Sequence, residues 1–164
     1  LGVDRRGVGN QQLLGDVASH IPDVGGARVH PTAGASCVGA RDFLIAFNID
    51  LESADAGVAR AIAARVRESS GGFPFVKAMG LFLPSRDCAQ VSMNLTRFRE
   101  IPVEQVYETI QAEAASLGTA IRAPELIGFV PEAAYRMAPR FYERARNFTQ
   151  ERVIERRIAG LKLY

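Results

Sequence analysis

Few residues of this sequence have the types and spacing that chemistry requires, and the most distinctive group precedes a predicted strand. In the stretch "HPTAGASCVGARDFLIAFN", residues 30–48, no side chain between His30 and Ala40 is larger than valine. Glycine and alanine let a ligand approach backbone N–H and C=O groups closely, but they also suit a tight turn. The residue types therefore leave two interpretations open, a ligand-binding backbone segment and a structural turn.

Residues that usually carry catalysis or hold metals form no recognisable group. The only two histidines are His20 and His30, and a lone histidine is more often structural than catalytic. The sequence has no Gly-Lys-Ser/Thr phosphate loop, no nucleophile elbow and no Cys/His spacing typical of a metal site. Asp87 next to Cys88 is typical of a turn. The residues themselves thus predict no metal site and no catalytic residue in this chain.

Composition restricts the class of protein. The 164 residues are 48% hydrophobic and 23% charged, which is typical of a single globular domain. No apolar stretch approaches the roughly 20 residues that a membrane helix needs. The two cysteines, Cys37 and Cys88, do not make a disulfide framework, so we expect a cytoplasmic location. The net charge is only +2 and no long block of like charge occurs, so neither nucleic acid nor membrane is an expected partner.

Hydrophobic periodicity predicts the order of the secondary structure. Residues 1–29 are rich in glycine and weakly patterned, and we interpret them as a connector. Beyond this segment, short apolar runs and the alternation of apolar with polar residues predict strands, and apolar residues that recur every four positions predict helices. The expected order is strand 43–50, a helix capped by Ser53, strand 75–83, strand 88–96, a helix from Pro102 to Gly118, strand 119–130 with Pro124 at an edge or bulge, and a helical tail.

This β-α-β-β-α-β order is that of a ferredoxin-like α+β sandwich, with helices on one face of a mixed or antiparallel sheet. The first and third strands should be central, and side-chain parity assigns their faces. Apolar residues should point toward the helices: Phe43, Ile45, Phe47, Ile49, Val91 and Met93. The opposite, open face should carry Leu44, Ala46, Asn48, Asp50, Gln90, Ser92 and Asn94.

The open face is rich in amides and hydroxyls, so it is either solvated or covered by a polar ligand or a second sheet. RNA-binding domains of this order display aromatic residues there, whereas the phenylalanines of this first strand fall on the helix side. A nucleic-acid partner is therefore not expected. The amide and hydroxyl residues Asn48, Gln90, Ser92 and Asn94 are the candidate site residues of this face.

Four ordered blocks resemble a known family. "HPTAGASCVGARDFLIAFN", "SSGGFPFVKAMG", "AQVSMNLT" and "ELIGFVPEAA" are similar to the formiminotransferase domain of glutamate formimidoyltransferases, specifically to its C-terminal subdomain with the preceding connector. The resemblance continues into "NFTQERVIERRI". It implies that residues 1–29 connect to a missing N-terminal subdomain and that residues 30–164 form the C-terminal subdomain.

The resemblance also implies a function. Enzymes of this family transfer a formimino group from N-formimino-L-glutamate to tetrahydrofolate, their co-substrate, in histidine degradation, and hold the folate between two similar subdomains. The segment that resembles their folate-binding stretch comprises Gly25, Gly26, Ala27, Arg28, Val29, His30, Pro31, Thr32, Ala33 and Gly34. Within it, Arg28 could pair with a carboxylate of the folate tail and Thr32 could form a hydrogen bond. The family often has Gly-Pro where this chain has Gly25-Gly26.

The resemblance places the family's catalytic histidine in the N-terminal subdomain, and this chain has no counterpart of it. We therefore expect the chain alone to be inactive and to act with that subdomain, as a truncated piece or a split protein. Members commonly dimerise, so a homodimer is a further expectation. The alternative is a stand-alone small-molecule-binding or regulatory module that keeps the fold without the chemistry.

Overall fold

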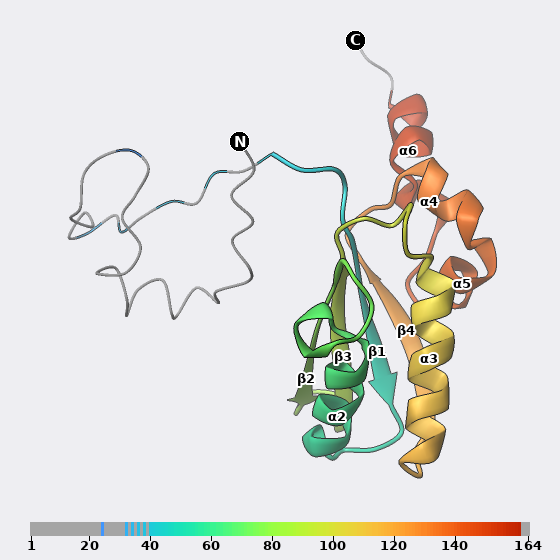
Figure 1. Cartoon of the computed structure of the whole chain (residues 1–164). Coiled ribbons are helices and arrows are strands. Elements are labelled where there is room, and N and C mark those ends of the chain that lie inside the picture. The colour runs from blue at the N-terminus through green and yellow to red at the C-terminus, as the bar shows by residue number, and fades with distance from the viewer. Residues whose placement is uncertain are drawn as a thin grey trace. The chain divides into compact units, whose positions relative to one another are not determined.

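The computed structural model describes residues 41–161 throughout and, before them, Val24, Thr32, Gly34, Ser36, Val38 and Ala40. Backbone contacts divide the chain into Leu1–Ala40 and Arg41–Tyr164. All the helices and strands discussed below belong to the second unit (Figure 1).

The elements follow the predicted β-α-β-β-α-β order and end in a helical tail. The first six are β1 (Ile45–Leu51), α2 (Ala56–Val66), β2 (Val76–Leu83), β3 (Cys88–Leu95), α3 (Val103–Ser116) and β4 (Ile121–Ile127). A short 3-10 helix, η1 (Glu68–Ser70), follows α2. The tail consists of α4 (Glu132–Met137), α5 (Pro139–Arg144), the 3-10 helix η2 (Gln150–Arg152) and α6 (Ile154–Gly160).

The four strands form one sheet in the order β2-β3-β1-β4, and every neighbouring pair is antiparallel. The prediction of an α+β fold with the first and third strands at the centre is confirmed. Pro124 lies in β4, which is an edge strand, and the register of β4 against β1 shifts at Asp50/Leu51. An edge strand tolerates proline because one side of its backbone needs no ladder partner.

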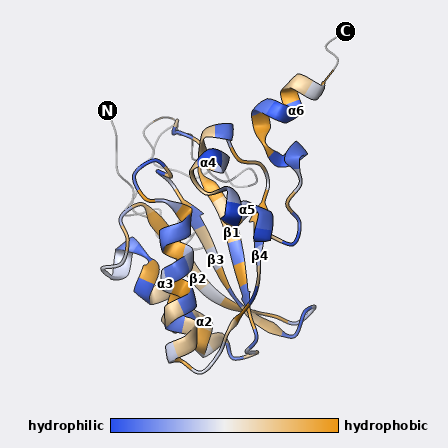
Figure 2. Ribbon diagram, turned by 90° about the vertical axis from the view of Figure 1, so that its right-hand side faces the viewer, coloured by the Kyte–Doolittle hydropathy of each residue, from blue (hydrophilic) through white to orange (hydrophobic). Residues whose placement is uncertain are grey.

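The apolar face of the sheet forms the core with α2 and α3. Ile45, Phe47 and Ile49 of β1 are fully buried, and their partners in β3 across the sheet are also buried. Both helices add buried side chains to this core at helical spacing, among them Ile62 of α2 and Ile110 of α3. Each helix also carries hydrophilic residues (Figure 2), as expected of an amphipathic helix on a protein surface.

A close backbone contact fixes α2 on the sheet. A Cβ atom built at Gly80 of β2 would lie 2.1 Å from the backbone nitrogen of Arg60 and 2.2 Å from the carbonyl carbon of Ala59. Only a residue without a side chain fits at this contact. The helix can therefore approach β2 more closely than any larger residue would permit.

Two local predictions are wrong. Phe43 is 61% exposed rather than buried, because β1 begins at Ile45, opposite the last residue of β3, and leaves Phe43 beyond the sheet. The N-cap of α2 is Asp55 rather than Ser53, and an Asp55 carboxylate oxygen accepts a hydrogen bond from the Gly57 N–H at 2.7 Å. A carboxylate suits this position because it also interacts favourably with the helix dipole.

Candidate functional site

Most of the segment predicted to bind folate lies outside the described residues. This applies to Gly25, Gly26, Ala27, Arg28, Val29, His30, Pro31 and Ala33. Of the other two, Thr32 is exposed and Gly34 is half-buried. Gly34 has a φ of +69°, in the left-handed region that favours glycine. This backbone conformation is compatible with both interpretations of the segment, a ligand-binding backbone and a turn.

The sheet brings the predicted open-face residues together. The register places Asn48 of β1 directly opposite Ser92 of β3, and Asn94 opposite Ala46. Asn48 and Ser92 are half-buried and Asn94 is exposed, whereas the neighbouring odd-numbered residues of β1 are fully buried. The amides and hydroxyl therefore form a polar strip across the two central strands, on the face opposite the core.

Gln90 lies on the same face, but its side chain is buried and is not available to a ligand as those of the polar strip are. It is only 3% exposed, and its side-chain amide donates a hydrogen bond of 2.6 Å to Asp50. Asp50, its partner in the β1–β3 register, is fully buried. Both residues are part of an ionic cluster that covers this end of the sheet face.

We define the sheet-end cluster as Asp50, Arg86, Gln90, Glu125 and Arg146. Arg86 donates to Asp50 at 3.1 Å and binds both carboxylate oxygens of Glu125, at 3.0 and 3.1 Å. Arg146 contacts the same two acids, Asp50 at 2.5 Å and Glu125 at 2.9 Å. Two guanidinium groups thus share two carboxylates in paired geometry, which is among the stronger arrangements of charged hydrogen bonds.

Several distant segments build the cluster. Asp50 is the next-to-last residue of β1, Gln90 and Glu125 belong to β3 and β4, and Arg86 comes from the turn between β2 and β3. Arg146 follows α5. The next residue, Asn147, fixes its position because the Asn147 side chain pairs with both the N–H and the C=O of Leu126, at 2.9 and 2.7 Å. This contact holds the segment along the outer edge of β4.

The cluster supplies hydrogen bonding but no nucleophile. Cys88, adjacent to it in sequence and structure, is fully buried. Burial, and next the negative charge of Asp50, raise the pKa of the Cys88 thiol, so the reactive thiolate form is disfavoured. This end of the sheet can therefore hold hydrogen-bond donors and acceptors in fixed positions next to the polar strip.

Within the described part of the chain, no group of three or more His, Cys, Asp or Glu side chains could hold a metal ion. In the same part, no helix is long and apolar enough to cross a membrane.

Sequence reasoning missed Arg86, Glu125 and Arg146. The parity of β1 placed Asp50 on the polar face, and an acid in the middle of a sheet needs a cationic partner if it is buried. That signal could have prompted a search for arginines. The partners themselves lie 36 and 96 residues away along the chain, and no local pattern marks them.

Comparisons with known proteins find one family and related enzymes that match most of the chain. The Formiminotransferase domain family matches residues 46–163. A glutamate formimidoyltransferase of Thermoplasma acidophilum is 38% identical over 137 residues, which cover 84% of this chain and 45% of the relative. A second one, of Streptococcus pyogenes serotype M1, is 36% identical over 140 residues, covering 85% and 47%.

The same similarity extends to longer proteins. A formimidoyltransferase-cyclodeaminase of Dictyostelium discoideum is 39% identical over 127 residues, which cover 74% of this chain and 24% of the relative. The chain thus spans less than half the length of the curated relatives it matches. The family match covers both central strands, the sheet-end cluster and the helical tail, and the chain belongs to the formiminotransferase domain family.

Proposed function

We propose that this chain is the folate-facing part of a glutamate formimidoyltransferase. The complete enzyme would transfer the formimino group of N-formimino-L-glutamate to tetrahydrofolate, in histidine degradation. The observation that carries the proposal is the alignment of 84% and 85% of the chain with two relatives that bear this enzyme name.

In this proposal the polar strip is the wall of the folate site. Asn48, Ser92 and Asn94 offer uncharged donors and acceptors to a flat heterocycle, and the buried Gln90 supports the strip from the sheet-end cluster. The segment from Gly25 to Gly34 is a further proposed folate-binding element, through its backbone N–H and C=O groups. Such a combination, in which a few polar groups fix orientation, is typical of small-molecule sites.

The remainder of the enzyme would supply the chemistry. Transfer of the formimino group forms one C–N bond and breaks another, so a proton must move between nitrogen atoms. The described residues contain no histidine, and Cys88 is buried as a thiol. We propose that the acid/base group comes from a partner that corresponds to the relatives' remaining length, an N-terminal subdomain. We also propose that the enzyme is cytoplasmic and forms a homodimer.

Folinic acid, a stable reduced folate, tests the site. Nuclear magnetic resonance titration should shift backbone signals of residues 46–48 and 92–94. Replacing Asn48 with leucine, which has a similar size and no amide, should weaken binding about tenfold by removing hydrogen bonds in the strip. Gln111→Leu on the exposed side of α3 is the control and should bind like the unchanged chain.

The proposal fails if folinic acid produces no shifts in the strip, both with the chain alone and with the N-terminal part of a relative added. The alternative, a ligand-binding module without catalysis, would bind a small molecule at the polar strip. Adding the N-terminal part of a relative would then produce no transfer of the formimino group.

A further inference from the structure

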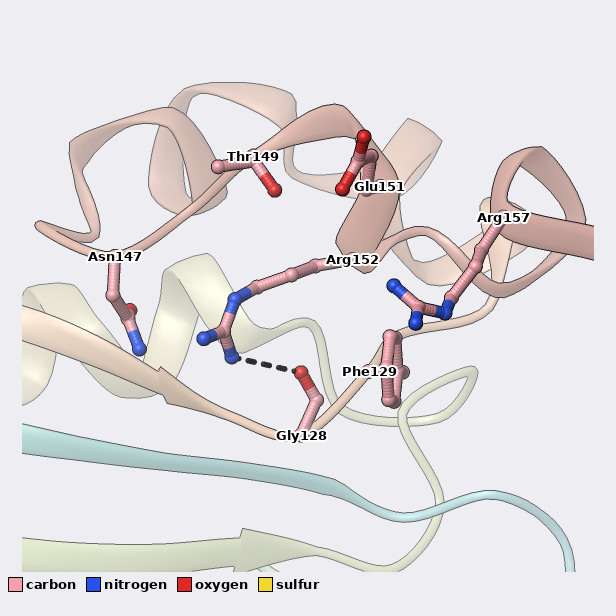
Figure 3. Close-up of a pocket in the computed structure, with 7 residues that line it drawn as sticks. All are labelled: Gly128, Phe129, Asn147, Thr149, Glu151, Arg152 and Arg157. Carbon is pink, nitrogen blue, oxygen red and sulfur yellow. Dashed lines mark hydrogen bonds between the residues drawn. The ribbon is translucent and has the colours of Figure 1, made fainter. Parts of the chain in front are cut away.

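The two edges of the sheet differ in how their backbone groups are satisfied. The tail covers the outer edge of β4, where the Asn147 side chain binds both the N–H and the C=O of Leu126. Arg152, in the pocket between this edge and α6, donates to the carbonyl oxygen of Gly128 at 3.1 Å, just beyond the end of β4 (Figure 3). The tail thus occupies the positions that a further strand would need.

The outer edge of β2, by contrast, is free. The Thr96 N–H donates to the Phe75 carbonyl oxygen at 2.9 Å, which extends the β2–β3 register by one hydrogen-bonded pair. Because such pairs alternate with non-bonded pairs along an antiparallel ladder, the N–H and C=O groups of Ala78, Gly80 and Phe82 point away from β3. Among residues 41–161, none of these groups has a hydrogen-bond partner.

β2 carries few of the features that protect exposed strand edges. Proteins usually protect them with proline, a bulge, several charges or a very short strand. β2 is eight residues long, contains no proline and pairs with β3 without a shift in register. Its side chains Met79 and Phe82 are 59% and 40% exposed, and alternation places them on opposite faces. The edge therefore offers both hydrogen-bonding groups and apolar surface to an added strand.

Two cations lie on the two sides of this edge. Lys77 is the only charged residue of β2, and alternation places it on the same face as Met79 and the polar strip. Arg60 of α2 lies on the other face, where its backbone nitrogen is next to Gly80. Both side chains are exposed, and neither pairs with an acid in the described part of the chain.

The position of Arg60 decides between two kinds of partner. Arg65, five positions later and about 140° around the helix, pairs with Glu113 of α3 at 3.1 Å. Arg60 is therefore on the flank of α2 that faces away from α3, and α3 lies on the β4 side of α2 (Figure 1). A second copy paired with β2 would bring its own Arg60 close to this one, and the like charges would oppose the pairing. An acidic segment would instead be attracted by both Arg60 and Lys77.

We propose that the outer edge of β2 binds an extended acidic segment of another protein. The segment would add a strand to the sheet through the outward N–H and C=O groups of β2. Its acidic side chains would lie beside Lys77 and Arg60. In such complexes backbone pairing supplies affinity and side chains at alternate positions supply specificity. The inference rests on residues of this chain alone and does not depend on the proposed transferase role.

A peptide of four Glu-Val repeats, blocked at both ends, tests the proposal by nuclear magnetic resonance titration at pH 7. We expect saturable binding that slows amide hydrogen exchange at Ala78, Gly80 and Phe82. The same peptide with lysine in place of glutamate should bind at least tenfold more weakly. Ala78→Pro removes an outward N–H that the β2–β3 ladder does not use, so the variant should fold and bind the Glu-Val peptide at least tenfold more weakly.

A pair of charge variants tests the choice of partner without altering the backbone. Lys77→Gln combined with Arg60→Gln should weaken binding of the Glu-Val peptide at least tenfold. The matched control, Arg140→Gln combined with Arg157→Gln, removes two exposed cations of α5 and α6 and should leave binding unchanged.

The proposal is overturned if the Glu-Val peptide does not bind, if its lysine counterpart binds as tightly, or if the two double variants bind alike. It is also overturned if the three amides become protected as the concentration of the chain alone rises, because a second copy would then occupy the edge. Each of these results would leave the folate titration and the proposed transferase role unaffected.

Discussion

At the scale of single residues, the most consequential side chain is Asp50. It is fully buried in the sheet, yet it accepts hydrogen bonds from Gln90, Arg86 and Arg146. A buried carboxylate is tolerated only when its charge is matched and its oxygens are bonded. The sheet-end cluster therefore explains how a carboxylate can be buried near the end of a central strand without destabilising the fold.

Replacement of Asp50 with asparagine should lower the free energy of unfolding by about 2–3 kcal/mol, since two arginines would then share the single charge of Glu125. The value is below that of a fully buried pair because the arginine side chains are 37% and 32% exposed. Urea denaturation monitored by circular dichroism measures the change.

Glu52→Gln is the matched comparison for Asp50→Asn. Glu52 pairs with Arg122 at 3.3 Å, but the Glu52 side chain is 54% exposed whereas that of Asp50 is 1% exposed, so the cost should stay below about 1 kcal/mol. Equal losses in the two variants would contradict the role assigned to the sheet-end cluster.

At the scale of elements, α6 is attached to α4 chiefly through polar contacts. Glu132 at the start of α4 accepts hydrogen bonds from Arg156 of α6 at 2.7 and 2.8 Å, and Arg156 also lies over the Tyr135 ring. Glu155 of α6 in turn accepts from the Glu132 backbone N–H at 2.7 Å. By contrast, Ile158 is 55% exposed. The attachment of α6 should therefore depend on charge, and thus on pH.

The hydrogen bonds from Arg156, and then from Arg136, lower the pKa of Glu132 from 4.5 to about 2. Because the pKa is lower in the folded protein, the contribution of Glu132 is complete above pH 4.5 and is lost as the pH falls toward 2. Amide hydrogen exchange should show α6 losing protection through this interval before the core strands do.

In a Glu132→Gln variant, the protection of α6 should already be reduced at neutral pH and should change little between pH 5 and pH 2. The amides of β1 and β3 provide the internal reference for general acid unfolding. Equal protection of α6 at pH 5 and pH 2 in the unchanged chain would rule out the proposed charge-dependent attachment.

At the scale of the whole molecule, the periodicity of apolar residues predicted the order of the strands and helices and the two faces of the sheet. Alternation in β1 and β3 assigned the buried and polar faces, and the positions of Asn48, Ser92 and Asn94 follow from it. Contacts between distant segments could not be predicted. Arg146 donates to Asp50, which lies 96 residues earlier in the chain, while the adjacent Asn147 binds the edge of β4. Gln90 is buried and donates to the same Asp50. The pocket beside α6 likewise depends on how the tail folds back onto β4.

The chain corresponds to less than half of its curated relatives, and its described residues, which include the polar strip, contain no histidine. We propose that the polar strip serves a transferase that a second part completes.

The most direct measurement is formimino transfer from N-formimino-L-glutamate to tetrahydrofolate, assayed with the chain, with the N-terminal part of a glutamate formimidoyltransferase relative, and with the two together. We predict transfer only in the mixture, and a reduced rate at low folate concentration when the chain carries Asn48→Leu. Transfer by the N-terminal part alone at the rate of the mixture, or no transfer in a mixture whose two parts form a stable complex, would contradict the account.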